Sequence, residues 1–170
     1  MPELLLGAGR DHKKRYWNES LGVSREWNGL RTLDVEPSTN PDVLWDLNDC
    51  PWPFDNNTFS EIHAYEVMEH LGSQGDFRAF FAHFYEAWRI LEPGGLFVFT
   101  CPKYDTVWAW GDPGHTRIIN DGSVVFLDQQ EYVKQTVAMT DYRHWWKGDF
   151  ECVVNAYTEE HYLAVLKARK

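Results

Sequence analysis

The chain has 170 residues, of which 44% are hydrophobic, and a formal net charge of −10 at pH 7. This length and composition suit one globular domain spanning residues 1–170 and exclude a disordered chain. The negative charge argues against a protein that binds nucleic acid mainly through the phosphate groups of the nucleic acid.

The three cysteines, Cys50, Cys101 and Cys152, are widely separated. They form neither a disulfide framework nor a metal-ligand cluster, so we expect free thiols, no metal centre and a reducing, cytoplasmic location. The start of the chain, Met1-Pro2-Glu3, lacks the features of a signal peptide, and no apolar run is long enough to cross a membrane. We therefore expect no membrane partner.

The first predicted element is a short apolar run, Glu3 to Leu6, which ends in Gly7-Ala8-Gly9. Its length suits a buried parallel strand, and the glycines let the backbone turn sharply and approach a ligand. A helix after such a turn points its free N–H groups at a bound nucleotide or nucleoside. We predict a short polar helix over Asp11 to Ser20. Its solvated face would carry the basic residues Arg10, Lys13, Lys14 and Arg15.

Three more short strands follow, at Arg31–Val35, Val43–Trp45 and Phe59–Tyr65. The first of these carries Asp34, about 25 residues after the glycines, close to the offset at which dinucleotide-type folds place a ribose-binding acid. The residues Glu66 to Leu71 are predicted to form a turn of helix or a tight bend.

The clearest helix is predicted over Asp76 to Leu91, because aromatic and aliphatic residues recur there at three- and four-residue spacings. It is predicted to end at Pro93-Gly94-Gly95, where proline cannot continue a helix. Leu96 to Thr100 is continuously apolar and predicts a central strand covered on both faces. The alternation of strands and helices indicates a parallel sheet with right-handed crossovers.

The regular pattern stops in segment 103–125, which is rich in glycine. A loop of this length in a compact domain is usually functional, so we interpret it as a variable substrate or lid segment. Leu127 to Thr140 is predicted as a helix, with Asp128 as its cap. Strands at Phe150–Tyr157 and His161–Lys167 are predicted to form a hairpin that closes the sheet in an antiparallel arrangement.

The order of these pieces resembles the class I S-adenosylmethionine-dependent methyltransferases, and most of all a group of small methyltransferase domains. The resemblance covers residues 3–102 well and is looser beyond. It is carried by six stretches in the family's order: Leu5–Gly9, Leu33–Val35, Pro41–Leu47, Pro51–Ile62, Val67–Leu71 and Trp88–Leu96.

The resemblance implies an α/β fold with one doubly wound, Rossmann-like sheet. About seven strands would be mostly parallel, with the last strand antiparallel and helices on both faces. It also implies S-adenosylmethionine as the cofactor. The cofactor-binding residues that it implies are Gly7, Ala8, Gly9, Asp34, Val35, Asp46, Leu47, Glu66, Val67 and His70.

Individual roles follow from the same resemblance. Asp34 would accept hydrogen bonds from the ribose hydroxyls, while Asp46 and Leu47 would meet the adenine. From the residues alone, the alternatives are that Asp34 is a plain acid at a strand end and that Asp46 caps a turn.

The candidate catalytic residues are His115, His70 and Glu69. His115 and Arg117 resemble a His-x-Arg loop that lies over the substrate pocket in many such domains. A histidine can act as a base at neutral pH when the acceptor must lose a proton. From the residues alone, Glu69 and His70 could instead hold the bend together.

Two departures from the family pattern bear on function. Leu5 stands where these enzymes usually carry an acid, and Arg10-Asp11 follows Gly9 where another glycine is usual. These departures keep open an alternative function, a non-catalytic binding or assembly protein with a degenerate cofactor site. A nicotinamide-dependent oxidoreductase would also require the missing third glycine of Gly-x-Gly-x-x-Gly.

The chain begins at the first strand, without the preceding helices that cover the site in related enzymes. We therefore expect an open site covered by segment 103–125, by a protein partner or by a second copy in a homodimer. The tryptophans at 108, 110, 145 and 146 could form core, a lid or an interface. A small-molecule or sugar-like acceptor is expected first, and a protein second.

Overall fold

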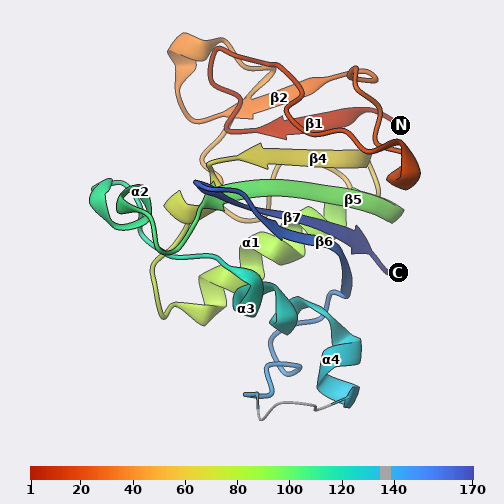
Figure 1. The fold of residues 1–170 in the computed structure, drawn as a ribbon. Helices are drawn as coiled ribbons and strands as arrows, with labels where there is room; N and C mark the ends of the chain where they lie inside the picture. Colours follow the sequence, from red (N-terminus) through yellow and green to blue (C-terminus); the bar gives the residue numbers. More distant parts are fainter. Residues whose placement is uncertain (135–138) are drawn as a thin grey trace.

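The computed structural model describes residues 1–134 and 139–170. Seven strands form one sheet in the order β3-β2-β1-β4-β5-β7-β6 (Figure 1). Neighbouring strands from β3 to β5 pair in parallel, and β7 pairs antiparallel with both β5 and β6. The strands are β1 (Glu3–Leu6), β2 (Arg31–Asp34), β3 (Val43–Leu44), β4 (Phe59–Tyr65), β5 (Leu91–Pro102), β6 (Phe150–Tyr157) and β7 (His161–Ala168). The predicted α/β fold, with a mostly parallel sheet of seven strands and a reversed last strand, is confirmed.

The central strand β5 is buried on both faces, as its apolar run predicted. Phe97 and Phe99 belong to the core on one face of the sheet, whereas Leu96 and Val98 belong to the core on the other. Because successive side chains of a strand point to opposite faces, a continuous apolar run is what two covered faces require.

The predicted aromatic helix is confirmed as α1 (Phe77–Ile90). The carboxylate of Asp76 caps it by accepting a hydrogen bond from the Ala79 amide at 3.0 Å. Phe81 and Phe84 are buried against the sheet, in the same core as Phe97. The aromatic stripe is therefore core.

The predicted end of this helix was placed too late. The helix stops at Ile90, because Leu91 already pairs with Phe59 of β4. Pro93, Gly94 and Gly95 thus lie inside β5, at an irregularity where the pairing moves on to Glu61 and Leu96. Proline and glycine are tolerated in strands at such bulges.

The same face of the sheet is covered by α3 (Asp121–Val124), η4 (Val125–Leu127) and α4 (Gln129–Lys134). Trp146 anchors this layer, since its indole N–H donates to the Leu127 carbonyl at 3.0 Å and its side chain is fully buried.

The helix predicted over Leu127 to Thr140 is confirmed only in its first part. Asp128 precedes α4 and accepts a hydrogen bond from the Gln130 amide at 2.7 Å, which ties down the start of the helix. Met139 and Thr140 lie outside any helix, and residues 135–138 lie outside the described part of the chain.

The opposite face of the sheet is covered by segment 10–30, and here two predictions were wrong. The helix predicted over Asp11 to Ser20 does not form; the helical structure described in this segment is one 3-10 turn, η1 (Glu19–Leu21). Lys14, placed on a solvated helix face, is buried instead, and its ammonium group forms ion pairs with Glu3 at 2.8 Å and Glu61 at 2.7 Å.

The reason lies in residues far from this segment in sequence. A short polar helix gains little stability from its own hydrogen bonds. Glu61 and His63, on β4, and Glu3, on β1, carry polar groups on the buried face, and Lys14 neutralises this cluster. Trp27 closes the cluster over the His63 ring, with 4.9 Å between ring centroids.

Segment 103–125 contains α2 (Val107–Gly111) as well as α3. In Figure 1, α2 projects beyond the carboxyl ends of β4 and β5. Its Trp108 and Trp110 are 62% and 73% exposed, whereas Trp146 belongs to the core. No helix in the described part of the chain is long and apolar enough to cross a membrane.

Candidate functional site

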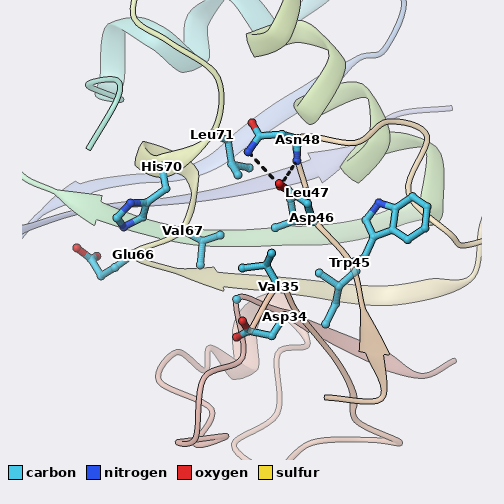
Figure 2. A pocket seen from close by; sticks show the side chains of 12 residues that line it. Asp34, Val35, Trp45, Asp46, Leu47, Asn48, Glu66, Val67, His70 and Leu71 are labelled. Atoms are coloured by element: carbon cyan, nitrogen blue, oxygen red, sulfur yellow. Dashed lines mark hydrogen bonds between the residues drawn. The ribbon is translucent and has the colours of Figure 1, made fainter. Parts of the chain in front are cut away.

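A pocket of about 330 Å³ lies at the carboxyl ends of β1, β2 and β4 (Figure 2). These strands meet where the strand order reverses, because the chain moves from β1 to β2 on one side and later to β4 on the other. Open α/β sheets bind ligands at such a switch point. The pocket is lined by Gly7, Leu33, Asp34, Val35, Trp45, Asp46, Leu47, Asn48, Glu66, Val67, His70 and Leu71.

The turn after β1 needs glycine for two different reasons. Gly7 and Gly9 have φ values of +56° and +55°, a region that other residues rarely adopt. A Cβ on Gly7 would also collide with Cγ2 of Val67, whereas a Cβ on Gly9 would meet nothing within 4 Å. At Gly7 the backbone of β1 therefore approaches the end of β4 too closely for any side chain.

Asp34 is the last residue of β2 and links that strand to the glycine turn. Its carboxylate accepts hydrogen bonds from the Gly9 amide at 2.7 Å and from the Glu36 amide at 2.8 Å. Each carboxylate oxygen keeps a further lone pair. Asp34 thus serves as a strand-end acid and, at the same time, presents two fixed acceptor atoms at the pocket.

The wall after β3 is formed by a capped turn. Asp46 accepts hydrogen bonds from the Asn48 amide at 2.9 Å and from its side-chain nitrogen at 3.1 Å (Figure 2). Asp46 therefore caps this turn, which was one of the two roles considered from the sequence. Beside it, Leu47 is buried and Trp45 is half-buried, so both offer apolar surface to the pocket.

The bend after β4 forms the opposite wall. Figure 2 shows Glu66 and His70 on one side of the pocket and Trp45 on the other. Glu66 has a φ of +58°, which is unusual for a residue with a side chain and marks local strain of a kind that gathers at functional sites. The 3-10 turn η3 (Met68–His70) follows, as predicted.

Glu69, His70 and His115 come together behind this wall, and of the three only His70 lines the pocket. The side chain of Glu69 is 2% exposed, and its carboxylate oxygens accept no hydrogen bond from the described residues. Nε2 of His115 lies 4.0 Å from Oε1 of Glu69, and the rings of His115 and His70 pack edge to face with centroids 4.6 Å apart. Burial raises the pKa of Glu69 to about 8, and the negative charge of Glu66 acts in the same direction.

Neither protein-family models nor curated protein sequences match this chain. Solved structures do. A SAM-dependent methyltransferase from Archaeoglobus fulgidus has a TM-score of 0.58 at 11% identity, covering 97% of this chain and 85% of that one. The N-methyltransferase NodS from Bradyrhizobium japonicum WM9, in complex with S-adenosyl-L-homocysteine, has a TM-score of 0.55 at 14% identity, covering 99% and 78%. A complex between the Haloferax volcanii Trm112 methyltransferase activator and the putative methyltransferase has a TM-score of 0.56 at 15% identity, covering 99% and 83%.

The chain has the class I S-adenosylmethionine-dependent methyltransferase fold. Within this methyltransferase fold, most residues predicted to bind the cofactor line the pocket. Two of them, Ala8 and Gly9, do not. Ala8 is buried in the core beneath segment 10–30, and Gly9 acts through its amide on Asp34.

Four pocket residues were missed from the sequence. They are Leu33, Trp45, Asn48 and Leu71. Each is the direct neighbour in the chain of a residue that was predicted, so a search of the flanking positions would have found all four. Trp45 carried the clearest signal, because it is a large aromatic residue directly before the predicted Asp46, where a short strand ends.

Two further residues of the methyltransferase pattern lie away from the pocket. Leu5 is buried in the core beneath segment 10–30, so an apolar residue is what its surroundings require. Arg117 is also buried, and its guanidinium donates to the carbonyls of Ser73 at 2.9 Å and Asp76 at 3.1 Å. Arg117 therefore holds the start of α1.

Proposed function

We propose that this chain binds S-adenosylmethionine in the switch-point pocket and transfers its methyl group to an acceptor. A small-molecule or sugar-like acceptor is proposed first, and a protein second. The proposal is carried by one observation: the bare backbone at Gly7 and the fixed carboxylate of Asp34 line the same pocket of a methyltransferase fold. A nucleoside needs both a close backbone and an acceptor for its ribose hydroxyls.

The walls of the pocket suit the two ends of this cofactor. Asp34 would accept hydrogen bonds from the ribose hydroxyls, and the apolar surfaces of Trp45 and Leu47 would lie against the adenine. Glu66 and His70, on the opposite side, would lie toward the methyl group. The bound cofactor supplies a methyl group already activated by a positively charged sulfur, so the protein needs mainly to orient the acceptor and exclude water.

His70 and His115 are proposed to face the acceptor. His70 lines the pocket, and His115 packs against it from segment 103–125. A neutral imidazole can accept a proton from an acceptor at neutral pH. Glu69 lies beside these rings, with its Oε1 4.0 Å from Nε2 of His115.

The second candidate is a non-catalytic protein that keeps the fold. It is favoured by Leu5, which replaces an acid, and by Asp46, whose carboxylate already accepts hydrogen bonds from its own turn. Such a protein would bind a nucleoside weakly, or not at all, and would not turn it over.

The exposed tryptophans of α2 are proposed to meet a partner. Trp108 and Trp110 are exposed residues of α2, and this helix projects beyond the carboxyl ends of β4 and β5 (Figure 1). A second copy or a different protein would cover them, as we expected from the sequence. One of the similar structures is itself a complex with a methyltransferase activator. Sedimentation velocity of the wild type, compared with Trp110→Ser, tests the homodimer.

Binding of the reaction product tests the proposed function. S-adenosylhomocysteine is titrated into the purified protein in a calorimeter, with NADH as the comparison ligand. Asp34→Asn removes the charge that would hold the ribose, and hydrogen bonds to charged groups contribute about 1.5–3 kcal/mol. We expect binding to weaken by roughly tenfold to a hundredfold in this variant.

Asp42→Asn is the matched control. Asp42 accepts hydrogen bonds from Thr32 at the other end of β2, outside the pocket, so its loss should leave nucleoside binding unchanged. Saturable binding of NADH in place of S-adenosylhomocysteine would instead support an oxidoreductase. Absence of binding by the wild type would contradict the enzymatic proposal.

A further inference from the structure

The cluster of Glu69, His70 and His115 has a feature that methyl transfer alone does not explain. A carboxyl group this deeply buried normally has a hydrogen-bond partner, because an unpaired buried polar group is costly. The carboxylate of Glu69 accepts none from the described residues, although its side chain is only 2% exposed. The groups beside it include the two imidazoles and the buried thiol of Cys101.

Both imidazoles are held through the same ring nitrogen. Nδ1 of His70 is bonded to the Gly114 carbonyl at 2.9 Å, and Nδ1 of His115 to the Trp108 carbonyl at 2.9 Å. A carbonyl only accepts hydrogen bonds, so each Nδ1 must carry the proton. In the neutral rings each Nε2 therefore presents a free lone pair. Metal-binding histidines in proteins are oriented in this way.

The spacing of the ligand atoms also fits an ion. Nε2 of His115 lies 4.0 Å from Oε1 of Glu69, which is too far for a hydrogen bond. In a tetrahedral site with metal–ligand bonds of about 2.0–2.2 Å, two ligand atoms lie about 3.3–3.6 Å apart, so the two groups would need to move only slightly closer. One ligand atom from each of the three residues lies within 4.8 Å of the others, so small rotations of the side chains bring all three within reach of one ion.

We propose that Glu69, His70 and His115 form a binding site for one divalent transition-metal ion. Two imidazoles and one carboxylate favour an ion such as Zn²⁺ or Fe²⁺ over Mg²⁺ or Ca²⁺, which prefer oxygen ligands. Three protein ligands leave open positions on the ion. The absence of a cysteine cluster in the sequence had led us to expect no metal centre, but this set joins residues 45 or 46 positions apart.

The site would select the acceptor, a step that rests on the proposed function. With an ion bound, the Nε2 lone pairs of His70 and His115 serve as ligands, so the ion takes the place of the imidazoles in promoting loss of the acceptor's proton. His70 also lines the pocket, so an ion held by His70 would lie beside the proposed methyl-donor end. An acceptor hydroxyl bound there would lose its proton to water more easily. Its oxygen would then form a bond to the methyl carbon, while the carbon–sulfur bond breaks and its electron pair stays on sulfur. We therefore expect acceptors that bear a hydroxyl group.

Metal binding is tested without nucleoside or acceptor. Untagged protein is freed of metal with a chelator, and zinc sulfate or magnesium chloride is titrated in a calorimeter. We expect one zinc ion per chain, much weaker binding of magnesium, and zinc affinity at least about tenfold lower in Glu69→Gln, His70→Ala and His115→Ala. His144→Ala, which removes an exposed histidine elsewhere, should leave the affinity unchanged.

The variants separate loss of the site from loss of the fold. His70 is exposed, so His70→Ala is expected to fold even if Glu69→Gln does not. Circular dichroism checks the fold of each variant. Absence of saturable zinc binding by the wild type would overturn the proposal, as would unchanged affinity in both histidine variants. If zinc binds and S-adenosylhomocysteine does not, the metal site stands, and the role in acceptor choice falls with the proposed function.

Discussion

Replacement of Lys14 by methionine should destabilise the protein strongly. The ammonium group of Lys14 lies 2.8 Å from the carboxylate of Glu3 and 2.7 Å from that of Glu61, and the three side chains are 1%, 3% and 9% exposed. Methionine keeps much of the apolar stem but leaves two carboxylates buried together without a cation. Breaking a buried ion pair in this way costs about 3–5 kcal/mol, a large share of a typical unfolding free energy of about 5–15 kcal/mol.

The loss should be smaller in acid. Burial alone would raise the pKa of Glu61, but hydrogen bonds from His63 and Lys14 lower it overall. Without Lys14, the carboxylates can be relieved by protonation. The destabilisation caused by Lys14→Met should therefore be largest near pH 7 and should shrink as the pH falls toward 4.

Urea unfolding followed by tryptophan fluorescence measures both effects. Lys13→Met is the matched control, because Lys13 is exposed and forms no described ion pair, so its replacement should change stability by less than about 0.5 kcal/mol. The reasoning is refuted if Lys14→Met costs no more than Lys13→Met at pH 7. In that case, packing of Trp27 and its neighbours, and not the ion pairs, would hold segment 10–30 on the sheet.

Two further predictions concern the pocket and the main helix. Gly7→Ala should lower the free energy of unfolding in urea by about 1–3 kcal/mol, because the new Cβ would collide with Val67 and strain the backbone. It should also abolish calorimetric binding of S-adenosylhomocysteine. Gly9→Ala strains the backbone without a collision, so its loss of stability should be smaller. Burial lowers the pKa of His83 to about 4, and the positive charge of Arg117 acts in the same direction. Between this pH and the ordinary pKa of 6.5, the unfolded state binds a proton that the folded state does not. Stability should thus fall by about 3 kcal/mol between pH 7 and pH 4, and a smaller fall in His83→Phe, measured by urea unfolding at both pH values, would confirm the source.

The strands and the aromatic helix could be predicted because their signals are local. The apolar runs of β1 and β5 and the spacing of Phe77, Phe81 and Phe84 each lie within one element, and burial follows from periodicity. The structure of segment 10–30 could not be predicted in this way. Its conformation depends on where Lys14 finds a counter-charge, and that information lies on strands β1 and β4.

The same distinction between local and distant signals applies to the candidate site. Asp34 and the glycine turn could be placed from the sequence, because each directly follows a predicted strand. The meeting of Glu69 with His115 could not, because it depends on the path of segment 103–125, which shows no regular pattern. The tautomers of His70 and His115 are set by backbone carbonyls that no side-chain pattern reveals.

Mapping of the nucleoside on the protein tests the central claim most directly. Amide chemical shifts of labelled protein are recorded as S-adenosylhomocysteine is added. The account predicts saturable shifts at the switch-point pocket, led by Gly7, Val35, Asn48 and Val67. Shifts confined to the hollow formed by residues 11–14 and 25–27 on the other face, or no shifts at millimolar ligand, would contradict it.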